Sequence, residues 1–92
     1  MPTPPVLLPT VLLHEVVLQA DASRVELLLW RSARGFAYRL ECAHAGALLV
    51  RYDNETPRGH LRSMLGRVTP YEFRSVEQLR YDFERDAQAA LR

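Results

Sequence analysis

Strict alternation of side chains between residues 36 and 43 is the feature that most constrains this fold. Aromatic or apolar residues alternate there with small or charged ones, in the order Phe36, Ala37, Tyr38, Arg39, Leu40, Glu41, Cys42 and Ala43. A period of two is typical of a β-strand with one buried face. Residues 24–31 and 47–53 have a similar pattern and are joined to this strand by short turns. Three consecutive strands with short turns predict an antiparallel meander.

The flanking segments extend this sheet. Residues 11–19 are aliphatic and β-branched and favour another strand, although their imperfect alternation leaves a short helix open as an alternative. Residues 68–74 favour a short edge strand, because Pro70 has no N–H to donate to a central ladder. Residues 54–67 are polar and contain a proline and two glycines, which predicts a loop.

The C-terminal residues predict a helix. Ser75 and Gln78 have the spacing of a capping box, in which a serine caps the helix and a glutamine follows three residues later. Apolar residues then recur on one stripe at helical spacing, namely Val76, Leu79, Phe83, Ala87, Ala90 and Leu91. Charged residues, including Asp86, are expected on or beside the solvated side. The predicted fold is therefore α+β: an antiparallel meander of four to five strands with this C-terminal helix packed on one face.

The length of 92 residues indicates one domain, which we place at residues 11–92. Residues 1–10 hold four of the six prolines and predict a Pro-rich arm that is disordered or polyproline-like. No basic leader is evident, and no apolar run approaches the roughly 20 residues of a membrane helix, so we expect a cytoplasmic protein without a membrane partner. Cys42 is the only cysteine, which excludes a disulfide framework and predicts a small buried hydrophobe.

The charged residues point to a local site. A net charge of +1 argues against a generally polybasic nucleic-acid binder, so any affinity for anions must be concentrated in one place. All twelve basic residues are arginines, whose forked guanidinium suits phosphate or carboxylate. The polar segment and its borders gather the candidate residues, which are Arg51, Tyr52, Asp53, Arg58, His60, Arg62, Arg67 and Tyr71. The three histidines are far apart in sequence and the nearby acids lack a ligand pattern, so we expect no metal and no other cofactor.

Two short blocks resemble a known family. The strand end Arg51-Tyr52-Asp53-Asn54, and the block Pro70-Tyr71-Glu72-Phe73 that leads into a helix containing Asp82-Phe83, are similar in order and spacing to the TumE-like family of bacterial toxin components. The likeness covers roughly residues 11 to 90. It implies the toxin component of a toxin–antitoxin pair, with a cognate antitoxin of the DNA-binding helix-turn-helix type as its partner. The family's loop usually carries closely spaced histidines with a basic residue between them. Of such a set this chain has only His60 and, two residues later, Arg62.

These residues suit metal-independent cleavage of RNA. His60 can transfer protons near neutral pH, Arg62 can stabilise phosphorane charge, and Asp53 could orient His60. Phosphate or base contacts are expected from the remaining candidates, Arg51, Tyr52, Arg58, Arg67 and Tyr71. The reduced histidine set leaves an alternative open: a non-catalytic module with a degenerate site, which binds an antitoxin or another protein or forms a homodimer through a sheet edge.

Overall fold

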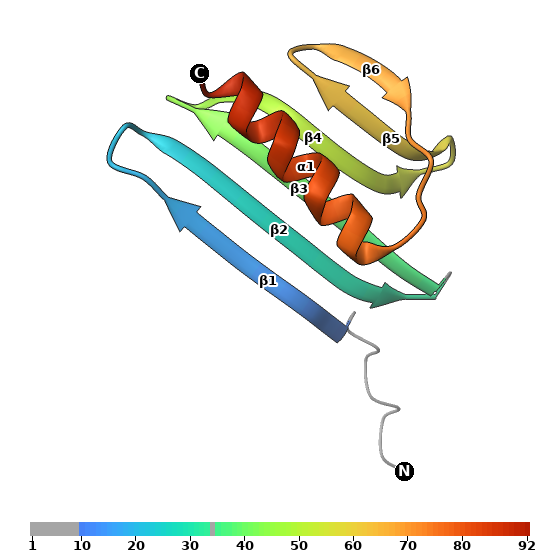
Figure 1. The fold of residues 1–92 in the computed structure, drawn as a ribbon. Coiled ribbons are helices and arrows are strands. Elements are labelled where there is room, and N and C mark those ends of the chain that lie inside the picture. Colours follow the sequence, from blue (N-terminus) through green and yellow to red (C-terminus); the bar gives the residue numbers. More distant parts are fainter. Residues whose placement is uncertain (1–9, 34) are drawn as a thin grey trace.

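A computed structural model describes residues 10–33 and 35–92 of the chain. In these residues a single antiparallel sheet carries six strands in sequence order, so that each strand pairs with the next (Figure 1). The strands are β1 (Thr10–Leu18), β2 (Ser23–Ser32), β3 (Gly35–His44), β4 (Ala47–Thr56), β5 (Gly59–Met64) and β6 (Arg67–Pro70). Helix α1 (Val76–Ala90) lies on one face. The predicted α+β meander with a C-terminal helix is confirmed, but with six strands rather than four to five.

The additional strand is β5, in the segment that was expected to be a loop. Strand β4 continues to Thr56, and a two-residue turn at Pro57 and Arg58 leads directly into β5. Gly59 takes a φ of +87°, which places it in the left-handed region that closes such a turn. Only Leu61 and Met64 in β5 are apolar, so the pattern that identifies a strand was too weak there. The N-terminal end of the sheet differs little from expectation: β1 starts at Thr10, and residues 1–9 lie outside the described residues.

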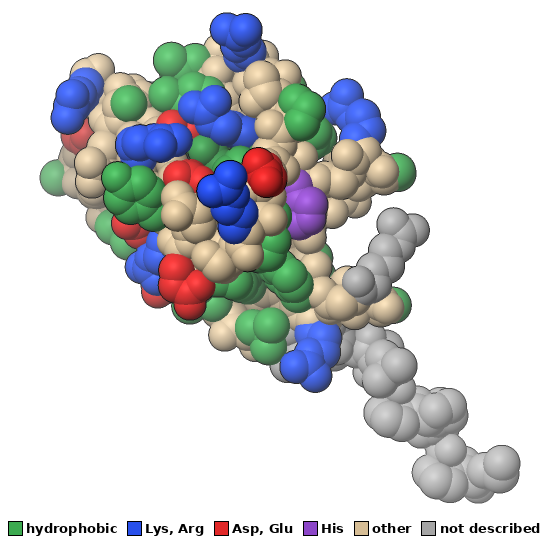
Figure 2. Space-filling model, turned by 45° about the vertical axis from the view of Figure 1, so that its right-hand side comes forward, with side chains coloured by type: hydrophobic (Ala, Val, Ile, Leu, Met, Phe, Trp, Pro, Cys, Tyr) green, Lys and Arg blue, Asp and Glu red, His purple; other side chains and the backbone are tan. Residues whose placement is uncertain are grey.

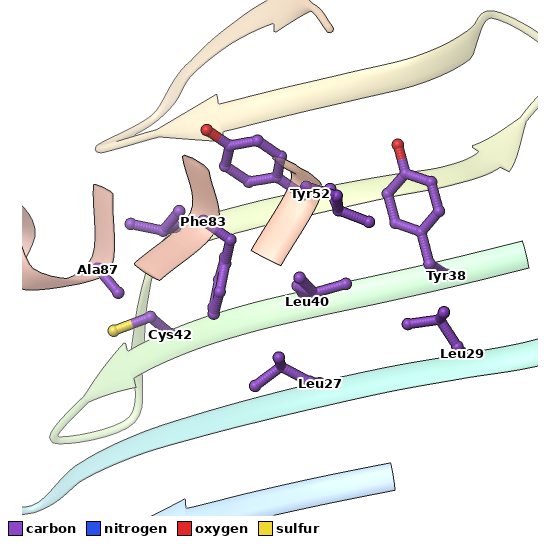
Figure 3. Packing of buried hydrophobic residues seen from close by; sticks show 10 residues of the cluster. Leu27, Leu29, Tyr38, Leu40, Cys42, Tyr52, Phe83 and Ala87 are labelled. Carbon is purple, nitrogen blue, oxygen red and sulfur yellow. The ribbon is translucent and has the colours of Figure 1, made fainter. Parts of the chain in front are cut away.

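The core lies between the sheet and α1 (Figure 3). The alternating residues of β2, β3 and β4 that face the helix are buried, as the pattern predicted. They pack with three apolar residues of α1, and the resulting cluster comprises Leu27, Leu29, Tyr38, Leu40, Cys42, Val50, Tyr52, Leu79, Phe83 and Ala87. Cys42 is a buried free thiol within this cluster. The hydrophobic effect therefore acts mainly on the middle of the sheet.

Helix α1 begins as the sequence predicted. Ser75 has extended backbone dihedrals, and its Oγ accepts a hydrogen bond of 3.0 Å from the backbone N–H of Gln78. The side chain of Gln78 does not return to Ser75 but donates to Asp82 at 2.9 Å, so only half of the capping box forms. Val76, which was expected on the apolar stripe, is 37% exposed at the first turn.

The sheet is wider than the helix that covers it. Figure 1 shows α1 lying across β3 and β4, with β1 and β6 at the two edges. The face opposite α1 carries a charged row in place of a second helix. Its members are linked by ion pairs within β3 and β4 and between them, and include Arg39, Glu41, Arg51, Asp53 and Glu55. On the face that carries α1, by contrast, polar side chains stand next to the core at β5.

Truncation of Phe83 tests whether α1 is the main stabilising element. Its side chain is fully buried against Tyr52, with the two ring centroids 5.9 Å apart. Phe83→Ala is expected to lower the free energy of unfolding by about 3–5 kcal/mol, a large share of the total for a small domain. Urea denaturation followed by circular dichroism measures this. Tyr81→Ala on the exposed side of the same helix is the matched control, and equal losses for both variants would contradict this packing.

Candidate functional site

Strand β5 places His60 and Arg62 on the same face of the sheet as α1. They are two residues apart, and successive side chains of a strand alternate between faces, so both point to the helix side. Arg62 stands opposite Tyr52 in the β4–β5 register, and Tyr52 belongs to the buried core on that side. The site therefore lies at the border of the core.

The His60 ring packs against two aromatic rings that also contact each other, with the centroids of Tyr38 and Phe73 5.8 Å apart. It stacks on Phe73 with centroids 5.2 Å apart and on Tyr38 with centroids 5.6 Å apart. A hydrogen bond of 2.8 Å joins Nδ1 of His60 to the hydroxyl of Tyr38. Phe36 extends the group, since its ring lies 5.2 Å from that of Phe73 and 6.1 Å from that of Tyr38. We call these four residues the aromatic cluster. It fixes the plane of the imidazole and leaves Nε2 without a protein partner among the described residues.

The Tyr38 hydroxyl sets the possible roles of His60. Burial, reinforced by the nearby charge of Asp53, raises the pKa of Tyr38 well above that of a free tyrosine, so the hydroxyl is neutral at ordinary pH. A neutral hydroxyl can donate to Nδ1 or accept from it. If Nδ1–H donates to Tyr38, Nε2 carries a lone pair and can act as a base. If the hydroxyl donates to Nδ1, the neutral ring carries its proton on Nε2 and can only donate from there.

Arg62 is held by Asp86 and Tyr52. We call these three residues the Asp86 network. Nε of Arg62 donates to Oδ2 of Asp86 at 2.5 Å and to the hydroxyl of Tyr52 at 3.0 Å. Tyr52 in turn donates to the same carboxylate oxygen at 2.6 Å. The hydrogen bond to Asp86 raises the pKa of Arg62, which stays charged. The Arg62 side chain is 32% exposed, and its two terminal nitrogens make no hydrogen bond within the described residues.

The position of Asp86 on α1 differs from the one expected from the sequence. It was placed on or beside the solvated side, but only 4% of it is exposed. Burial would raise the pKa of this carboxyl, but the hydrogen bonds from Arg62 and Tyr52 outweigh that effect and hold the pKa below its ordinary value. A signal was present in the spacing: Asp86 follows Leu79 by seven residues and Phe83 by three, which places it on the buried stripe.

Two of the predicted site residues lie elsewhere. Asp53 pairs with Leu61 in the register, so its side chain is on the face opposite His60. Its carboxylate instead accepts from Arg51 Nε at 2.7 Å and from the backbone N–H of Glu55 at 3.3 Å. Arg51 is on that face too and also contacts Glu55. The hypothesis that Asp53 orients His60 is therefore corrected: Tyr38, which sequence reasoning assigned only to the core, holds the imidazole.

The other predicted residues surround the site. Arg58 is exposed in the turn two residues before His60, and Arg67 is exposed at the start of β6. Tyr71 packs edge-on against Tyr52 with centroids 4.9 Å apart, and its hydroxyl donates to Asp82 at 2.7 Å, so that proton is already engaged. Figure 2 shows arginine side chains mixed with acidic ones around a histidine at the surface, rather than a uniform basic patch.

Residues 10–33 and 35–92 contain neither a metal-binding group nor a membrane-spanning helix. No group of three or more His, Cys, Asp or Glu side chains is arranged to hold a metal ion in this range. No helix in it has the length and apolar character required to cross a membrane. His14 lies on edge strand β1 and bonds Glu26 at 2.8 Å, while His44 is exposed at a turn, so neither contributes to the site.

Comparison with known proteins gives no relative to draw on: no family model matches the chain, and no curated protein or solved structure is significantly similar to it. The likeness to TumE-like toxins therefore stays an expectation from short blocks of sequence.

The Asp86 network predicts a specific loss of stability in acid. A carboxyl whose folded pKa is depressed contributes fully above its unfolded pKa of about 3.9 and loses that contribution as pH falls through the folded value. Asp86→Asn is therefore expected to cost about 1–3 kcal/mol of unfolding free energy at pH 7. The gap between the variant and the wild type should shrink below about pH 4. Thermal unfolding at pH 7, 5, 4 and 3 measures it, with Glu84→Gln on the exposed side of α1 as control. A gap that stays constant with pH would contradict the assignment.

Proposed function

We propose that this protein is the toxin component of a bacterial toxin–antitoxin pair and that it cleaves RNA without a metal. One observation carries the reaction: His60, with a fixed ring plane, stands two residues from Arg62, and neither Nε2 of His60 nor the terminal nitrogens of Arg62 make a hydrogen bond to residues that the structure describes. When the ribose 2′-oxygen attacks the adjacent phosphodiester, a group must take its proton and a cation must neutralise the charge on the phosphoryl oxygens. The toxin role is supported by the resemblance of the Arg51–Asn54 and Pro70–Phe73 blocks to the TumE-like family of toxin components.

In the proposed reaction the histidine acts as the base. Nδ1–H of His60 donates to the Tyr38 oxygen, and Nε2 accepts the proton of the ribose 2′-hydroxyl. The 2′-oxygen forms a bond to phosphorus while the bond from phosphorus to the 5′-oxygen breaks. A 2′,3′-cyclic phosphate and a 5′-hydroxyl result, and water supplies the proton to the departing oxygen. Arg62, with Arg58 from the neighbouring turn, neutralises the charge that develops on the phosphoryl oxygens.

Tyr38 is a positioning residue in this scheme, because it acts only through His60. When its oxygen accepts from Nδ1–H, the Nε2 lone pair of the neutral ring is left free for the substrate. Asp86 and Tyr52 have a parallel role for Arg62. Because both of them bond Nε, the guanidinium is fixed through that nitrogen, and its two terminal nitrogens are left to contact the phosphate.

Induced expression tests the role and the reaction together. The wild type is expected to arrest growth with loss of total RNA, and His60→Ala to do neither. Purified wild type should release products that end in a 2′,3′-cyclic phosphate. Tyr38→Phe, which keeps the ring but removes the hydroxyl, should lower kcat by about 10–100-fold with KM little changed, since general-base catalysis contributes about 100–10,000-fold.

The outcomes separate the parts of this proposal. Arrest without RNA loss would retain the toxin role and eliminate the reaction. RNA cleavage that persists in His60→Ala would eliminate the assigned base. Absence of arrest by a folded wild-type protein would eliminate the toxin role.

Strand β1 favours the second candidate, a binding module. It is a nine-residue edge strand, and it exposes large aliphatic side chains, including Val11 at 57% and Leu18 at 73%. The opposite edge, β6, has four residues and ends in Pro70, which shortens and protects it. A long unprotected edge of this kind is suited to pairing with another strand, either in a homodimer or with an antitoxin.

Sedimentation equilibrium tests self-association through this edge. The wild type is expected to form a dimer at micromolar concentration, and Val16→Lys to be monomeric, because a charge on an edge strand opposes strand addition. Val68→Lys on β6 is the matched control at the other edge, where a similar side chain is 52% exposed. A monomeric wild type would eliminate the homodimer.

A further inference from the structure

Arg85 contacts the same carboxylate as Arg62. Its Nε lies 3.7 Å from Oδ1 of Asp86, while Nε of Arg62 donates to Oδ2 of that residue. The two guanidiniums thus approach different oxygens of one acid, one from helix α1 and the other from strand β5. Arg85 was not among the candidate residues of the site, but this shared acid places it beside one of them.

The side of α1 that carries Arg85 faces β5 and β6. Asp82, Arg85 and Asp86 are three or four residues apart, so they share one side of the helix. Tyr71, which follows β6, donates to Asp82 at 2.7 Å, and Arg62 of β5 donates to Asp86. Nη1 of Arg85 is 3.8 Å from Oδ1 of Asp82, so its guanidinium is within ion-pair distance of both acids. Arg85 therefore lies at the same border of the core as the candidate site.

The Arg85 side chain is free to accept an anion. Both of its contacts are beyond the roughly 3.2 Å limit of an N–H···O hydrogen bond, and 57% of the side chain is exposed. Arg80 on the same helix is different, because its nitrogens donate to Glu84 at 2.9 Å and to Glu15 on β1 at 2.8 Å. An anion can therefore bind Arg85 without displacing a hydrogen bond, whereas at Arg80 it must displace several.

Positive charge exceeds negative charge among the residues of this border. Arg67 on β6 also points to the helix side, since its register partner on β5 packs against the core. Arg62, Arg67 and Arg85 thus stand beside two acids, Asp82 and Asp86. One positive charge is left unbalanced among these five residues, which favours an anionic ligand.

The position of Asp86 separates the two arginines as ligands. A phosphate placed between Arg62 and Arg85 would lie against the carboxylate that both of them contact, and like charges repel. Each arginine is therefore better placed to bind a phosphate of its own. A single RNA strand supplies such a pair, because it carries one phosphate per nucleotide.

We propose that Arg85 binds the phosphate next to the one that Arg62 holds, so that the protein recognises single-stranded RNA with at least two consecutive phosphodiesters. The inference rests on the proposed function, since that function assigns the scissile phosphate to Arg62. Arg85 is a substrate-binding residue in this scheme and takes no part in the proton transfer at His60.

Binding without cleavage tests this contact. The full-length wild type is titrated with a short 2′-O-methyl oligoribonucleotide, which lacks the hydroxyl needed for cleavage, and the anisotropy of an end label is followed over a range of salt concentrations. Arg85→Gln is expected to weaken binding by about 2–5-fold at low salt, as for the loss of an exposed ion pair. It should also reduce the slope of log K against log salt by about 0.7, the value for one phosphate of a single strand.

Two variants control for other effects of the substitution. Arg80→Gln removes an arginine of similar exposure from the side of the same helix that faces β1, and it should leave affinity and slope unchanged. Arg85→Lys keeps the charge and should restore the slope. Circular dichroism confirms that the variants are folded. Weaker binding by Arg85→Gln with an unchanged slope would overturn the phosphate contact, because it would indicate an indirect effect on the fold.

The length of the substrate gives a second measurement. Per scissile bond, the wild type is expected to have a higher kcat/KM for a trinucleotide, with two phosphodiesters, than for a dinucleotide, with one. Arg85→Gln should remove most of this difference and cleave the dinucleotide like the wild type. Equal slowing of both substrates would overturn the inference, because Arg85 would then act only through Asp86 on Arg62.

Failure of this inference can be told apart from failure of the reaction. Binding that depends on Arg85, without RNA cleavage by the wild type, would overturn the reaction and support the inference. Cleavage that requires His60, with neither the salt slope nor the length preference changed in Arg85→Gln, would overturn the inference alone. Absence of binding by the folded wild type at low salt would overturn both.

Discussion

The structure depends on one buried carboxylate. Asp86 accepts hydrogen bonds from Tyr52 on β4 and Arg62 on β5, so it links α1 to two strands at the border of the core. An isolated buried carboxylate would cost several kcal/mol, and a buried ion pair stabilises only when its remaining polar atoms are satisfied. Tyr52 gives Oδ2 a second donor beside Arg62, and the Nε of Arg85 lies 3.7 Å from Oδ1. The geometry that makes this acid tolerable in the core is therefore the same geometry that fixes the arginine.

A single helix on a six-stranded sheet gives the two ends of the covered face different chemistry. On the side of β1 and β2 the surface beside α1 is apolar, with Val17 and Val25 next to Phe83 and Ala87. On the side of β5 the same face carries His60 and Arg62. The first surface is suited to contact with protein, and the second to contact with an anion. Both candidate functions thus correspond to distinct surfaces of one fold, and one does not exclude the other.

Much of the fold was predictable because it depends on local pattern. Alternation located β2, β3 and β4, and the serine cap with the helical stripe located α1. Strand β5 was missed because its helix-facing residues include His60 and Arg62, whereas the pattern requires apolar residues on that face. The residues of the candidate site were proposed in part from the sequence: His60 and Arg62 were among the candidates, but Tyr38 and Asp86 were not. Contacts between residues 22 and 24 positions apart carry no signal in a single sequence.

The same physical fact accounts for the missed strand and for the site. A strand with polar residues at two of its three core-facing positions must be held there by specific partners, and β5 has them: two aromatic rings against His60 and an acid–tyrosine pair on Arg62, while Met64 packs against the core. Each partner removes conformational freedom from a side chain that would otherwise be mobile at a surface. Preorganisation of this kind is costly for stability alone, since an apolar pair would pack as well without desolvating charge. Its presence at adjacent helix-facing positions of one strand is what directs attention to β5 as the functional element, rather than to the longer and more regular strands beside it.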